Sequence, residues 1–75
     1  MTVRLVDPQG TILAECADPR MTRDDVAQSY AFALRQTRTG EDEVDWRVVN
    51  DAIIERWSLS ALKYIKEAAW RRTRG

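Results

Sequence analysis

The sequence predicts an α+β fold in which an N-terminal β-hairpin packs on a three-helix bundle, in the order ββααα. Three observations lead to this prediction. Two β-branched and aliphatic runs joined by DPQG indicate the hairpin at about residues 2–17. Apolar residues then recur at helical spacing, and Gly40 and the SLS stretch divide them into helices at about 23–38, 46–57 and 60–72. A chain of 75 residues supports one hydrophobic core, so we expect residues 1–75 to form a single small domain.

The hairpin is predicted from the runs TVRLV and TILAEC and from the turn between them. Asp, Pro and Gly stand in DPQG where a type I turn with a glycine bulge requires them, so Gly10 is expected at positive φ. This register pairs Val6 with Ile12 and Leu5 with Leu13. Both faces then carry aliphatic side chains. We expect one face to pack on the helices and the other to need a partner.

The first helix is predicted to begin after Thr22, a good N-cap residue, with Asp24 and Asp25 in the first turn, where the helix dipole favours negative charge. Its core face is expected to comprise Val26, Tyr30, Ala33, Leu34 and Thr37, with Ala27 beside them. Phe32 points nearly the opposite way, which makes it a candidate apolar anchor on the surface.

The second and third helices are predicted to share a core. Asp45 is the expected N-cap of the second helix, and Ser58 or Ser60 that of the third. Asn50 lies within the apolar stripe of the second helix. We interpret it as the hydrogen-bond partner of a nearby polar group rather than as a residue that binds a ligand or a base. The expected core stripe is Trp46, Val49, Ile53 and Trp57, packed against Leu62, Ile65 and Ala69.

Catalytic chemistry has little support in the composition. The chain has no His and one cysteine, Cys16, which we interpret as a small buried residue. The acidic residues fall on helix faces and in a loop, and the three glycines are isolated. We therefore expect a non-enzymatic protein with no catalytic residue, cofactor or metal site. No apolar run approaches the roughly 20 residues of a membrane span, so a cytoplasmic protein without membrane contact is expected.

The charge is distributed unevenly. The formal net charge is zero, but residues 1–59 carry −4 and residues 60–75 carry +4. Helical spacing places Trp70 within the cationic side of the third helix, opposite the predicted core side. Trp and Arg are the residue types that dominate binding hot spots. The candidate partner-binding residues are therefore Lys63, Lys66, Trp70, Arg71 and Arg74, with Phe32 as a second anchor.

Two functional hypotheses follow from this surface. The first is a small accessory protein that acts through protein–protein contacts with an unidentified partner and self-associates as a homodimer, each basic end near the partner copy's acidic loop at residues 41–45. The alternative is a small DNA-binding protein that uses the third helix in a helix-turn-helix-like arrangement. The neutral net charge, the non-basic second helix and the absence of Gly from SLS weigh against this alternative.

The stretch DWRVVNDAIIERWSLSALKYIKEAAW resembles the compact helical hairpins of short bacterial and phage-encoded proteins. The resemblance implies a bacterial source or a phage or other mobile element. It points to no named family, and it assigns no role to any residue.

Overall fold

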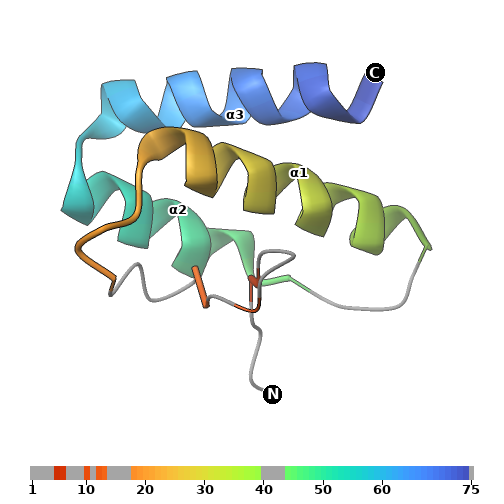
Figure 1. The fold of residues 1–75 in the computed structure, drawn as a ribbon, viewed down its shortest axis with the longest axis horizontal. Coiled ribbons are helices and arrows are strands. Elements are labelled where there is room, and N and C mark those ends of the chain that lie inside the picture. Colours follow the sequence, from red (N-terminus) through yellow and green to blue (C-terminus); the bar gives the residue numbers. More distant parts are fainter. Residues whose placement is uncertain (1–4, 7–9, 11, 14–17, 40–43, 75) are drawn as a thin grey trace.

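The protein is a bundle of three helices over the part of the chain that the computed structural model describes, residues 5, 6, 10, 12, 13, 18–39 and 44–74. The helices are α1 (Arg23–Thr39), α2 (Trp46–Arg56) and α3 (Leu59–Arg74). Figure 1 shows α1 and α3 side by side and running in the same direction, while α2 runs back in the opposite direction. The helix positions agree with the predicted ranges to within one or two residues.

The predicted α+β fold with an N-terminal β-hairpin is wrong, because the described residues contain no strand. They contain one isolated antiparallel bridge, between Val6 and Ile12, and a hydrogen bond from the Leu13 amide to the Leu5 carbonyl. The predicted pairing of Val6 with Ile12 is thus confirmed, but it does not extend into a ladder there. Aliphatic residues indicate burial as much as strand pairing, and here Leu5 and Leu13 are fully buried. The remaining hairpin positions lie outside the described residues: 2–4, 7–9, 11 and 14–17.

The predicted positive φ of Gly10 is confirmed. Gly10 has φ +89°, in the left-handed region that side chains with a Cβ rarely adopt. A Cβ at this position would meet nothing within 4 Å, so backbone conformation rather than space selects glycine here.

Each helix begins at a side-chain cap that the sequence predicted. At α1, the Asp25 amide donates to Thr22 Oγ1 (3.2 Å) and the Thr22 amide donates to Asp25 Oδ2 (3.0 Å), which is a reciprocal capping box. At α2, Asp45 Oδ1 accepts from the amides of the second and third helical residues. At α3, the Ala61 amide donates to Ser58 Oγ (3.2 Å), which selects Ser58 over Ser60 as the cap.

The core is a single apolar cluster. The predicted stripes are largely confirmed: Val49, Ile53 and Ile65 are buried, whereas Trp46 and Trp57 pack against the cluster and stay half-buried. The cluster draws on the N-terminal segment and on all three helices: Leu5, Leu13, Met21, Val26, Ala27, Tyr30, Ala31, Ala33, Val49, Ile53, Leu62, Ile65 and Ala69. Of the predicted α1 face, Leu34 is half-buried. For Thr37 the structure describes the backbone only.

Small residues and polar bonds join α1 to α3. Ala27 and Ala31 are buried on the side of α1 that carries Asp24, and Asp24 bonds α3 twice. Its carboxylate accepts from the Tyr64 hydroxyl (3.2 Å), and its carbonyl accepts from Arg72 Nη1 (3.1 Å). Because alanine side chains are short, the two helices pack closely along this contact.

Aromatic side chains, in contrast, separate α1 from α2. The rings of Tyr30 and Trp46 lie 4.6 Å apart between centroids, and the Tyr30 hydroxyl donates to Asn50 Oδ1 (3.2 Å). Leu5 and Leu13 are fully buried in the same apolar cluster, so the N-terminal segment completes the core of the bundle. The structural interpretation of Asn50 agrees with this contact.

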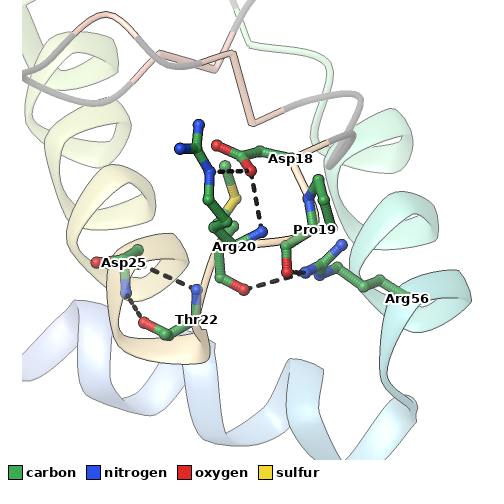
Figure 2. Close-up of polar contacts among 7 residues, drawn as sticks. Asp18, Pro19, Arg20, Thr22, Asp25 and Arg56 are labelled. Carbon is green, nitrogen blue, oxygen red and sulfur yellow. Dashed lines mark hydrogen bonds and ion pairs between the residues drawn. The ribbon is translucent and has the colours of Figure 1, made fainter.

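The segment that leads into α1 is attached to the end of α2 by Arg56. Figure 2 shows the Arg56 guanidinium reaching the backbone of residues 18–22, where Nη2 donates to the carbonyls of Pro19 (3.0 Å) and Met21 (3.1 Å). The same guanidinium lies 4.8 Å from the ring centroid of Trp57. Within the segment, Asp18 Oδ1 accepts from the Arg20 amide and side chain.

Candidate functional site

The third helix has two faces of opposite character. Its inner side buries Leu62, Ile65 and Ala69 in the core. The opposite side, which we call the α3 outer face, comprises Lys63, Lys66, Glu67, Trp70, Arg71 and Arg74, and all six side chains are exposed. At about 100° per residue these six positions form one continuous stripe along the helix. The predicted cationic surface of the third helix is therefore assembled on a single face.

Trp70 is on the surface of the described structure. Its side chain is 40% exposed. A surface depression of about 440 Å³ adjoins the ring and is lined by Glu67, Trp70, Arg71 and Arg74. An indole ring beside guanidinium groups offers an apolar contact and charge-assisted donors at one place. This combination is suited to binding a partner side chain.

The α3 outer face carries a positive charge. It has four cations and one carboxylate, Glu67. Arg71 Nη2 lies 2.8 Å from Glu67 Oε1, and both side chains are largely exposed, so this ion pair contributes little to stability. The remaining cations, Lys63, Lys66 and Arg74, flank Trp70 along the helix. A partner for this face is expected to bring negative charge.

The structure does not bring Phe32 to this surface. Phe32 lies on α1 and is half-buried, and the described residues that line the depression beside Trp70 all belong to α3. We therefore leave Phe32 out of the candidate surface. The remaining five predicted residues, Lys63, Lys66, Trp70, Arg71 and Arg74, share the α3 outer face.

A second exposed face, on α2, was missed in the sequence. The α2 outer face comprises Arg47, Val48, Asp51, Ile54 and Glu55, all exposed, with Val48 at 48% and Ile54 at 38%. Sequence reasoning assigned the core stripe of this helix and gave the rest of the surface no role. The available signal was the i,i+4 pair of acidic residues, Asp51 and Glu55, flanked by aliphatic side chains.

Leu59, the first residue of α3, is another large apolar side chain on the surface. It is 56% exposed, and at helical spacing it lies on the same side of α3 as Lys66 and Trp70. Apolar side chains thus lie on either side of Lys63 and Lys66 along the helix. Sequence reasoning gave Leu59 no role.

The Tyr30 hydroxyl, a polar group at the core, is occupied in a structural contact. Burial raises the pKa of Tyr30 from its ordinary value of 10.0 to about 12, and its hydroxyl is bonded to Asn50. In the part of the chain that the structure describes, no group of three or more His, Cys, Asp or Glu residues is placed to hold a metal ion. Cys16 lies outside that part. None of the described helices has both the length and the apolar character needed to cross a membrane.

No protein-family model, curated protein or solved structure matches this chain. The outer faces of α2 and α3 are therefore the basis for proposing a function.

Proposed function

We propose that this chain is a non-catalytic binding protein that contacts a protein partner through the α3 outer face. The observation that carries the proposal is the position of Trp70. A large aromatic side chain lies 40% exposed on the side of α3 opposite the core, next to a depression lined by Arg71 and Arg74. Buried Trp and Arg anchors supply most of the free energy in typical protein interfaces.

Packing of the core does not account for Trp70. The neighbouring Ala69 is fully buried. It is a small residue, and it is the last buried residue of α3. Apolar surface left in water forgoes roughly 25 cal/mol per Å², so an exposed indole represents unused binding free energy. A partner that covers the ring and pairs with the surrounding cations would gain binding free energy from apolar burial and from charge pairing.

The arrangement of α2 and α3 favours a protein over DNA as the partner. In a DNA-binding helix-turn-helix the two helices cross at about 90–120°. Here only Trp57 and Ser58 separate the helices, and Figure 1 shows them running in nearly opposite directions. The exposed carboxylates of Asp51 and Glu55 would in addition repel phosphates near α2.

The positive charge of the α3 outer face keeps DNA binding as a second candidate. It predicts binding to mixed genomic DNA fragments at low salt, with an affinity that falls steeply as salt rises. Fluorescence anisotropy measures this directly. Absence of binding at low salt would remove the candidate.

Site-specific photo-crosslinking in the cells that encode the chain tests the proposal. A photoreactive phenylalanine derivative replaces Trp70 in one version and Gln28, an exposed α1 residue, in the control. We expect a discrete, protease-sensitive and nuclease-resistant product from position 70 that is absent from position 28. A nuclease-sensitive product would establish the DNA alternative instead. Equal labelling at both positions would refute a specific α3 surface.

A further inference from the structure

The α2 and α3 outer faces are complementary in charge and similar in apolar content. On α3, Lys63 and Lys66 lie between the exposed side chains of Leu59 (56%) and Trp70 (40%). On α2, the corresponding features are two carboxylates and two exposed aliphatic side chains, Val48 (48%) and Ile54 (38%). Arg47 at the edge of this face reduces its net charge to −1. Both faces belong to one chain whose net charge is zero.

The α3 outer face is poorly suited to contact its own copy. A symmetric α3–α3 contact would bring Lys63, Lys66 and Arg74 of both copies together, and Glu67 is already paired with Arg71. Like charges held in contact oppose association. A second copy would therefore have to present a different, acidic surface to α3.

The α2 outer face meets this requirement better than the acidic loop predicted from the sequence. Asp45, at the end of that loop, caps α2 by accepting from the amides of Arg47 and Val48. Residues 41–43 lie outside the described structure. Asp51 and Glu55, in contrast, are exposed one helical turn apart, at about 6 Å of axial rise.

Spacing along the helices selects an antiparallel contact. If Lys63 lies opposite Glu55, then Lys66 falls within one residue of Asp51, and Trp70 falls opposite Val48 near the start of α2. A parallel contact would instead pair Lys63 with Asp51 and Lys66 with Glu55. It would place Trp70 beyond Arg56, where α2 ends. The antiparallel arrangement also opposes the two helix dipoles, which is favourable.

We infer that the partner is a second copy of this chain, and that the α3 outer face of one copy packs antiparallel on the α2 outer face of the other. This inference rests on the proposed function, since it names the partner of the same surface. Lys63 pairs with Glu55 and Lys66 pairs with Asp51 across the contact, while Trp70 covers Val48. Because these pairs lie at the protein surface, raised salt weakens the association.

Charge exchange between the two faces provides the test. Variant A carries Lys63→Glu and Lys66→Glu, and variant B carries Asp51→Lys and Glu55→Lys. All four positions are exposed and all four replacements are good helix formers, so both variants should fold, which circular dichroism verifies. A matched control places Gln28→Glu or Gln28→Lys on α1.

Sedimentation velocity across a concentration series reads the outcome. We expect the parent and the Gln28 controls to self-associate, variants A and B to be monomeric when alone, and an equimolar mixture of A and B to associate again. In that mixture, α3 of variant A faces α2 of variant B, and α3 of variant B faces α2 of variant A. Each of these two contacts pairs opposite charges. Trp70→Ala should weaken association of the parent about tenfold or more.

Three results would overturn the inference: a parent that is monomeric at its highest soluble concentration, variants that associate alone as the parent does, or a mixture that stays monomeric. The crosslink from position 70 separates this failure from failure of the proposed function. A product with a different protein, formed by a monomeric parent, would retain the binding function and remove the second copy as partner.

Discussion

The two sides of α1 are packed in different ways. Toward α3, buried alanines such as Ala27 and Ala31 allow close packing, and Asp24 bonds α3 at two places. Toward α2, the rings of Tyr30 and Trp46 occupy the space between the helices. The short side chains let α1 and α3 approach closely, whereas the rings hold α1 and α2 farther apart, and a close-packed interior then requires other side chains to fill the space beside the rings.

The N-terminal segment provides that completion. Leu5 and Leu13 are fully buried in the cluster that includes Tyr30, Val49 and Ile53, although the segment forms no strand in the described residues. The difference between the two contacts therefore predicts opposite sensitivities. Loss of volume should be most harmful on the α2 side of α1, and gain of volume should be harmful on the α3 side.

The largest expected effect is that of Leu13→Ala. Truncating a fully buried leucine leaves a cavity and costs about 2–5 kcal/mol of unfolding free energy. This is a large fraction of the stability of so small a domain. Urea unfolding measures the loss, with Ile12→Ala as the control because Ile12 is 40% exposed. Equal losses for the two variants would show that the N-terminal segment is no part of the core.

The next effect concerns pH. The pKa of Tyr30 is near 10 in the unfolded chain and about 12 in the folded one. Its contribution to the free energy of unfolding is therefore complete below pH 10 and is lost as pH rises to 12. Two pKa units correspond to about 2–3 kcal/mol. Tyr30→Phe should remove this component of the alkaline loss, which urea unfolding below pH 10 and near pH 12 measures. Tyr64→Phe, at a 49% exposed position, serves as the control. An unchanged alkaline loss in Tyr30→Phe would contradict the assignment.

The smallest of the three expected effects is that of Ala31→Leu on the α3 side. Ala31 is 2% exposed, and a larger side chain there would push α1 and α3 apart. Overpacking of this kind costs about 1–3 kcal/mol. Thermal unfolding compared with Gln28→Leu, which adds the same side chain at an exposed position of α1, isolates the packing contribution. A variant as stable as this control would mean that the two helices are not closely packed.

Local features of the fold were predictable from the sequence. The caps Thr22, Asp45 and Ser58 act within one helical turn, so short patterns identify them. The same holds for the position of Trp70 relative to the core side of α3, because helical periodicity decides it. The five predicted residues of the α3 outer face were therefore found together.

Features that depend on distant residues were not predictable. The apolar pattern around Leu5 and Leu13 reads the same whether the segment pairs as strands or only fills the core, and the neighbouring helices decide between the two. Arg56 binds carbonyls 35 and 37 residues away, and no pattern near Arg56 indicates this. The exposure of Phe32 was likewise set by tertiary packing, which leaves it half-buried.

The separate surroundings of the three tryptophans make the molecule its own optical probe. Trp46 stacks near Tyr30 between α1 and α2, Trp57 lies beneath the Arg56 guanidinium, and Trp70 faces solvent from α3. Each indole thus senses a different junction. In variants that retain one tryptophan, emission from Trp46 would follow separation of α1 from α2, and emission from Trp57 would follow release of the segment before α1. A blue shift confined to Trp70 would report occupation of the α3 outer face while the rest of the bundle stays unchanged.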